Sequence, residues 1–223
     1  MSGAAVVLHY FQGKGLAQPI RLMLWEAGVQ YEERFVDTKE KLEALRTNGD
    51  LVFQQLPLLE IDGLKLIQSS AIVRYLARKY SMYGKTSTDQ VHCDMLAEGI
   101  KDMVSKIAGY LFQADKEAWK AEVSPLIPRY LNAFTSYLSQ NNNKEMKGYL
   151  LGDTITFVDI TLFDVLERLT EIFPGMLEEY PFIKSFHARM LSRENIKKYY
   201  TSGAVLLTGD DYVRQVRTVL NRK

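Results

Sequence analysis

Two different hydrophobic periods divide this chain. Up to about residue 80, short apolar and alternating runs typical of strands lie between stretches whose apolar residues recur at helical spacing. The Asp62-Gly63 pair between two apolar runs predicts a hairpin turn. The predicted order is therefore βαβαββα: strands over 6–11 and 31–36, a hairpin over 58–67, and helices over 19–28, 38–45 and 69–80.

From about residue 86 onward the period of two is lost and only helical spacing remains. The predicted helices span 88–112, 116–140, 156–172, 182–191 and 210–221. Pro125 and Pro128 lie inside the second of them and predict a kink or a break, because proline lacks an N–H and clashes with the preceding turn. We expect an α+β/α architecture, with a mixed domain over 1–82 and an all-helical domain over 88–223.

Composition excludes several classes of protein. The 223 residues carry 28 Lys and Arg against 27 Asp and Glu, so no basic field indicates a nucleic-acid partner. The single cysteine excludes an internal disulfide and fits a reducing compartment. No apolar run approaches the roughly 18 residues that span a bilayer, and the apolar start at 4–8 lacks the basic leader of a secretory signal. We expect a cytoplasmic protein without membrane insertion.

The segment 54–63 and the Gln68-Ser69 pair contain the features of a site for a peptide-like anion. Pro57 adopts a cis bond at a lower free-energy cost than other residues, and a cis bond would turn the backbone of Leu56 outward to pair with an extended peptide. Ser69 precedes a helical pattern, where free N–H groups favour an anion. An ordinary hairpin followed by a capped helix is the alternative.

Three segments and a helix-capping motif resemble the cytosolic glutathione transferases, most closely their alpha class, over essentially the whole chain. The segments are 8–15, 53–63 and 68–72, and the capping box is formed by Thr156 and Asp159. The resemblance implies a thioredoxin-like N-terminal domain, an all-helical C-terminal domain and a homodimer. It also implies glutathione as co-substrate, small apolar electrophiles as the second substrate, and no metal.

The resemblance also implies roles for individual residues. Tyr10 falls on the catalytic tyrosine; a half-buried strand residue packing beneath the first helix is the alternative. Phe53 resembles the ring that inserts between helices of the partner subunit, whereas packing inside its own domain is the alternative. The residues that fall on glutathione-binding positions are Arg46, Gln55, Leu56, Pro57, Gln68, Ser69, Asp102 and Arg129, with Asp102 reaching across the dimer interface.

A hydrophobic site for the electrophile is expected from two regions: the last predicted helix, and the end of the helix predicted over 88–112 together with Phe11 and Leu16. Apolar residues recur at helical spacing in the last predicted helix, which resembles the C-terminal lid of the alpha class. A plain surface helix packed on the core is the alternative. The expected lining residues, which favour apolar and fairly bulky substrates, are Phe11, Leu16, Ile107, Tyr110, Leu111, Tyr212, Val213, Val216, Val219 and Leu220.

Several positions depart from the alpha-class pattern. Leu16 stands where that class has an arginine near the thiol, and Lys14 is offset from it by two residues. Ser69 replaces the usual threonine, and Ser70 stands where an arginine pairs across the dimer. These departures bear on the class more than on the family.

The chemistry implied by the resemblance requires a thiolate, and a free thiol with a pKa of ~8.5 is only a few per cent ionised at neutral pH. A tyrosine hydroxyl donating to the sulfur makes a charge-assisted bond worth roughly 1.5–3 kcal/mol, which lowers the thiol pKa by about one to two units. The leading hypothesis is therefore an enzyme that conjugates glutathione to apolar electrophiles.

Three other functions stay open at the level of sequence. One is a glutathione-dependent isomerase or peroxidase, which would use the same thiolate. Another is a binding protein without turnover, either a ligandin-like carrier or a crystallin-like descendant. The third is an interaction module of the kind found in translation factors and chloride-channel-like proteins, which usually lack the complete set of ligand residues.

Overall fold

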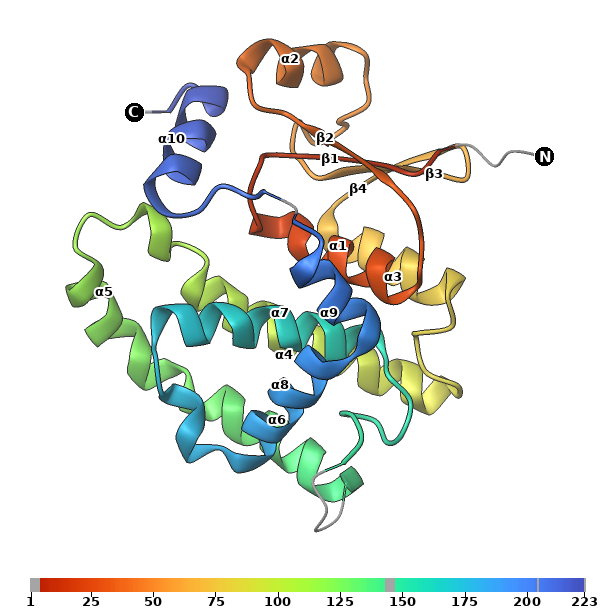
Figure 1. Cartoon of the computed structure of the whole chain (residues 1–223), viewed down its shortest axis with the longest axis vertical. Helices are drawn as coiled ribbons and strands as arrows, with labels where there is room; N and C mark the ends of the chain where they lie inside the picture. The colour runs from red at the N-terminus through yellow and green to blue at the C-terminus, as the bar shows by residue number, and fades with distance from the viewer. Residues whose placement is uncertain (1–4, 143–146, 204, 223) are drawn as a thin grey trace. The chain divides into compact units, whose positions relative to one another are not determined.

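The computed structural model describes residues 5–142, 147–203 and 205–222, and the chain forms two compact units. The first unit contains the residues up to 76 together with those from 198 onward, and the second contains 77–197 (Figure 1). The domain limits expected from the sequence, 1–82 and 88–223, stay a prediction. In the division into compact units, the residues from 198 onward belong to the first unit and not to the second.

A four-stranded mixed sheet in the order β2-β1-β3-β4 forms the centre of the first unit. Its strands are β1 (Val7–Tyr10), β2 (Glu32–Phe35), β3 (Leu58–Ile61) and β4 (Leu64–Ile67). β1 pairs in parallel with β2 and antiparallel with β3, so that Leu8 lies opposite both Glu33 and Leu59. Because parallel strands need a crossover, α1 (Gln18–Glu26) connects β1 to β2. The Asp62-Gly63 turn joins β3 to β4, as predicted.

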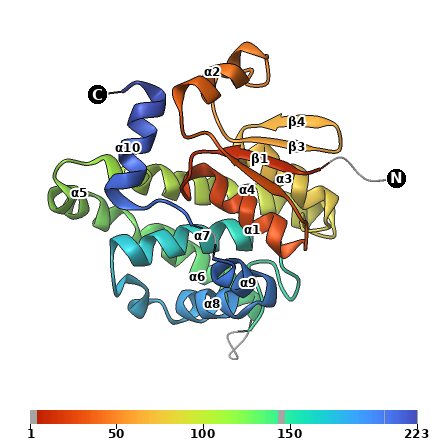
Figure 2. The same cartoon turned by 45° about the horizontal axis from the view of Figure 1, so that its top comes forward.

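Two further helices complete the predicted βαβαββα order. They are α2 (Lys39–Thr47) and α3 (Ser69–Lys79). α1 and α3 cover one face of the sheet, and α2 lies on the other face (Figure 2). Thr38 begins α2 as an N-cap, and its hydroxyl accepts a 3.3 Å hydrogen bond from the N–H of Lys41. This is the thioredoxin-like arrangement that the family resemblance implies.

Where it is described, the second unit consists of helices and 3₁₀ turns, with one isolated β-bridge between Tyr149 and Gly152. The helices are α4 (Ser87–Ile107), α5 (Lys116–Val123), α6 (Pro128–Asn142), α7 (Phe157–Ile172) and α8 (Pro181–Ser192), with single 3₁₀ turns η2 (Tyr110–Phe112), η3 (Ser124–Leu126) and η5 (Met176–Glu179). The predicted break falls at η3, and Pro128 begins the next helix, where its missing N–H has no helical partner to lose. α7 is buried along most of its length and packs against α4.

A fully buried carboxylate begins α7. Asp159 accepts hydrogen bonds from the N–H of Leu150 (2.8 Å) and from both the N–H (2.8 Å) and the hydroxyl (2.7 Å) of Thr156. This is the predicted capping box. Burial raises the pKa of the Asp159 carboxyl to about 6, because an ionised group loses its hydration there. A second capping box, which the sequence analysis did not identify, begins α4 with Thr86 and Asp89.

Two helices lie in the C-terminal region. The short α9 (Glu194–Thr201) crosses the limit between the units and was not predicted from the sequence. The predicted last helix is α10 (Gly209–Leu220), which packs beside α2 within the first unit (Figure 1). Across the described ranges, no helix is long and apolar enough to cross a bilayer.

Candidate functional site

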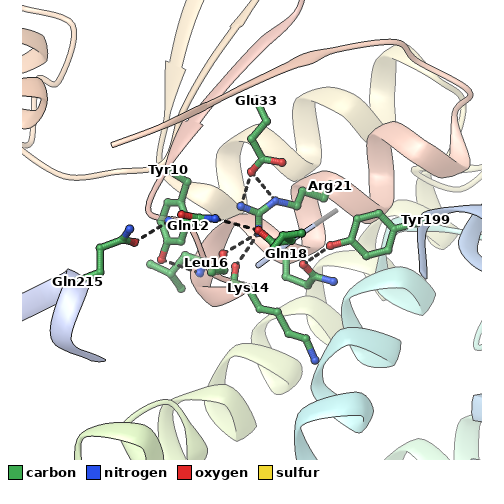
Figure 3. Close-up of polar contacts among 11 residues, drawn as sticks. Tyr10, Gln12, Lys14, Leu16, Gln18, Arg21, Glu33, Tyr199 and Gln215 are labelled. Carbon is green, nitrogen blue, oxygen red and sulfur yellow. Dashed lines mark hydrogen bonds and ion pairs between the residues drawn. The ribbon is translucent and has the colours of Figure 1, made fainter. Parts of the chain in front are cut away.

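Tyr10 ends β1 and is only 4% exposed, with the ring of Phe11 edge-on to it at 5.2 Å. The chain turns back at Gly15, in the 3₁₀ turn η1 (Gly15–Ala17), and the backbone N–H of Leu16 donates a 2.9 Å hydrogen bond to the Tyr10 hydroxyl oxygen (Figure 3). A hydroxyl has one O–H donor and two acceptor lone pairs. Because the oxygen accepts from Leu16, the O–H remains able to donate to a ligand atom.

A buried arginine holds the loop that follows β1, which we define as residues 11–16 and call the β1–α1 loop. Arg21 of α1 is 0% exposed, and its Nη1 donates to the carbonyl oxygens of Gly13 (2.8 Å) and Lys14 (3.2 Å). Its Nε donates to Glu33 at 2.6 Å, and Nη2 donates to the same carboxylate oxygen. A buried charge requires such a partner. The sequence analysis missed Arg21, although a charged residue inside an apolar helical run is a signal for it.

Gln12 binds the C-terminal segment at three points. Its backbone N–H donates to the side-chain oxygen of Gln215 at 2.8 Å, and its side-chain amide donates to the carbonyl of Val205 at 3.1 Å. Its own carbonyl accepts from the N–H of Leu207 at 2.7 Å. Figure 3 shows Gln12 and Gln215 beside each other, and the sequence analysis gave no role to either.

Tyr212 of α10 lies against the glycines of the β1–α1 loop. A Cβ on Gly13 would overlap the Tyr212 ring, and a Cβ on Gly15 would lie less than 3.0 Å from the hydroxyl oxygens of both Tyr10 and Tyr212. The two hydroxyls are therefore neighbours, and the loop requires glycine at both positions. The apolar face of α10 that carries Tyr212 is buried.

The predicted clamp for a peptide-like ligand lies at the start of β3 and of α3. The bond between Leu56 and Pro57 is cis, as expected. Leu56 is buried and Gln55 is exposed. Gln68, with a φ of 68°, precedes α3, and its carbonyl accepts from the N–H groups of the first helical turn at 2.9 and 3.0 Å. Ser69 is the first residue of α3.

Arg46 supports the loop that leads to this clamp. Its Nε and Nη2 donate to the carbonyl oxygen of Gln54 at 3.2 and 2.9 Å, and its Nη1 pairs with Glu43 at 2.7 Å. Phe53 precedes Gln54 and is 61% exposed, an unusual state for a phenylalanine.

Five predicted site residues belong to the second unit, where they lie on α4, η2 and α6. Asp102 is exposed on α4, and Ile107 is buried at the end of that helix. Tyr110 and Leu111 are half-buried in η2. Arg129, on α6, donates from Nη2 to the hydroxyl of its neighbour Tyr130 at 2.5 Å.

No group of three or more His, Cys, Asp and Glu side chains that could hold a metal ion occurs in the part of the chain that the structure describes. Cys93 is buried in α4, and burial raises the pKa of its thiol to about 12. A thiol in that state is poorly suited to act as a ligand or a nucleophile.

Comparison with known proteins identifies the family. Models of the glutathione S-transferase N-terminal and C-terminal domains match residues 6–78 and 101–203. Glutathione S-transferase A3 of Mus musculus is 37% identical over 208 residues, and glutathione S-transferase alpha-5 of Rattus norvegicus is 36% identical; each match covers 92% of both chains. The chain belongs to the glutathione S-transferase family, and these relatives support its likeness to the alpha class.

Solved structures agree. A nematode-specific glutathione S-transferase of C. elegans superposes with a TM-score of 0.80 at 29% identity, covering 92% of this chain and 99% of that one. A Nu-class enzyme from Haemonchus contortus gives a TM-score of 0.77 at 32% identity, covering 89% of this chain and 96% of that one.

Proposed function

We propose that this protein conjugates the thiol of glutathione to apolar electrophiles and that Tyr10 stabilises the reacting thiolate. The hydrogen bond from the N–H of Leu16 to the Tyr10 oxygen carries this proposal. It fixes the phenol and polarises it, since a hydroxyl that accepts a hydrogen bond becomes a stronger donor. Donation to the sulfur, worth roughly 1.5–3 kcal/mol, lowers the thiol pKa by about one to two units. The bound thiol is then substantially ionised at neutral pH.

Glutathione is an extended peptide with an anionic group at each end, and the clamp region offers complementary groups. In this proposal the backbone of Leu56 before Pro57 pairs with the peptide as an added strand, next to Gln55. Ser69 and Gln68 grip the γ-glutamyl end at the N-terminus of α3. The remaining proposed contacts are Arg46 to the glycyl carboxylate, Arg129, and Asp102 across a dimer interface.

The electrophile would lie on the apolar side of Tyr10. Leu16 is 47% exposed beside it, and Tyr212 brings the buried face of α10 to the β1–α1 loop. The proposed lining residues are Phe11, Leu16, Ile107, Tyr110, Leu111, Tyr212, Val213, Val216, Val219 and Leu220. A site built from such side chains favours apolar and fairly bulky substrates.

We further propose that the protein works as a cytoplasmic homodimer. The observation in favour is the exposed ring of Phe53, beside the exposed Val52. Covering these apolar side chains with a second subunit would remove them from water, which lowers the free energy of the dimer.

Glutathione conjugation to a generic aryl halide tests the proposal, with wild type compared with Tyr10→Phe. We expect a fall of tenfold or more in kcat/KM, equivalent to about 1.4 kcal/mol of transition-state stabilisation. Tyr180→Phe is the control, because it removes a hydroxyl outside every predicted site. A wild-type protein that binds glutathione without turnover would instead be a carrier. Full activity in Tyr10→Phe would reject the tyrosine mechanism.

A further inference from the structure

We propose that Gln215 is a positioning residue for the electrophile site. Through its bond to Gln12, it fastens α10 to the β1–α1 loop and holds Tyr212 beside Tyr10. The inference rests on the proposed function for its effect on catalysis, but the fastening itself is a property of the free protein and can be measured without turnover.

Gln12 is well placed to transmit this effect. It stands two residues after Tyr10, inside the loop whose N–H at Leu16 donates to the Tyr10 hydroxyl. Both its backbone groups and its side-chain amide are used by the segment 205–215. Two of these bonds are made to main-chain groups of the connection before α10, and only the bond to Gln215 reaches the helix itself.

The spacing along α10 links Gln215 to Tyr212. Residues three apart on a helix are neighbours on one side of it, so the side chain that binds Gln12 lies one turn from the ring that packs on Gly13. Gln215 is half-buried, whereas Arg214 and Thr218 beside it are exposed. The bond therefore fixes both the rotation of α10 and its distance from the loop.

Loss of this bond should loosen α10 without altering the groups proposed to hold glutathione. A hydrogen bond of net worth ~0.5–1.5 kcal/mol corresponds to a change of roughly threefold to tenfold in an equilibrium constant. We expect KM for a bulky apolar electrophile to rise by about that factor, and KM for glutathione to change by less than about twofold.

Three variants of the full chain distinguish the loss of the hydrogen bond to Gln12 from other effects of changing a side chain on α10. Gln215→Met has similar length but no acceptor oxygen at that place, and Gln215→Glu keeps an oxygen that can accept from the N–H of Gln12. Thr218→Ala alters an exposed side chain on the same helix and serves as the control. Amide hydrogen exchange over 205–222 and at Gln12 is measured on the free protein, together with the two KM values.

The proposal expects faster exchange at these amides in Gln215→Met by about threefold to tenfold, and rates close to wild type in Gln215→Glu and Thr218→Ala. Unchanged exchange in Gln215→Met, or equal loss in Gln215→Glu, would overturn it. Faster exchange with unchanged electrophile KM would overturn the catalytic part. If wild type does not turn over, the proposed function fails, while the exchange result still decides whether the fastening exists.

Discussion

The backbone N–H of Leu16 donates a 2.9 Å hydrogen bond to the hydroxyl oxygen of Tyr10. Because the donor belongs to the main chain, the tyrosine is oriented whatever side chain stands at position 16. The departure from the alpha-class arginine should therefore change the charge near the sulfur and leave the placement of Tyr10 intact.

Restoring a cation at that position should strengthen ionisation of the bound thiol. In wild type we expect the thiol pKa to fall by about one unit from ~8.5, the weaker end of the range for one hydrogen bond. Leu16→Arg should lower it by about one unit more, since a nearby cation favours the thiolate. The measurement is a titration of enzyme-bound thiolate absorbance, with Leu16→Gln as the uncharged control. A wild-type value near 6 would contradict this expectation.

The buried pair of Arg21 and Glu33 should matter for stability. Arg21→Met leaves a partly buried carboxylate without its cation and removes the donors to Gly13 and Lys14. We expect a loss of about 3 kcal/mol in the free energy of unfolding, measured with urea. The double variant Arg21→Met/Glu33→Leu should recover part of that loss. If the double variant is no more stable than the single one, the unpaired charge is not the cause.

Phe53 should contribute to subunit association. Phe53→Ala removes an exposed ring and should weaken the dimer by at least tenfold in its dissociation constant, equivalent to about 1.4 kcal/mol. Sedimentation of the two proteins over a range of concentrations measures this. Leu126→Ala, at another exposed apolar side chain, is the control. If the dissociation constant of the dimer is unchanged in Phe53→Ala, the ring lies outside the interface.

Asp159 should impose a pH dependence on stability. Its pKa is raised to about 6 in the folded protein by burial, against ~3.9 when unfolded, so the folded state favours the protonated form. The stabilisation associated with that proton is complete below about pH 4 and is lost as the pH rises through 6. Compared with Asp159→Asn, wild type should lose on the order of 2 kcal/mol between these limits. Parallel profiles for the two proteins in urea unfolding would contradict the assignment.

Much of the first unit could be predicted because its elements carry strong local signals. The β-branched and aromatic run near Val7–Tyr10, the Asp62-Gly63 turn and the helical spacing before Gly28 each indicated the element that the structure shows. Pro125 and Pro128 similarly predicted the break that separates α5 from α6. α9 gave a weaker signal, because it is short and only Ile196 and Tyr199 are buried in it.

The contacts around the β1–α1 loop could not be predicted from local patterns. Gln12 and Gln215 are 203 positions apart, and each is a polar residue that sequence reasoning would leave in solvent. The pairing of Arg21 with Glu33 was also hidden, because a charge inside an apolar helical run signals a buried arginine but does not identify its partner. The roles of Tyr10 and the glutathione residues came from the family resemblance, and they stay predictions.

The assignment of residues from 198 onward to the first unit has a consequence for synthesis. The ribosome makes 77–197 between the two parts of that unit, which at ~5–20 residues per second separates them by on the order of ten seconds. Throughout that interval Gln12 has no Gln215 to bind, and the ring of Tyr212 is not yet present to pack against the glycines of the loop. The contacts that complete the first unit can therefore form only after the whole helical unit has been translated.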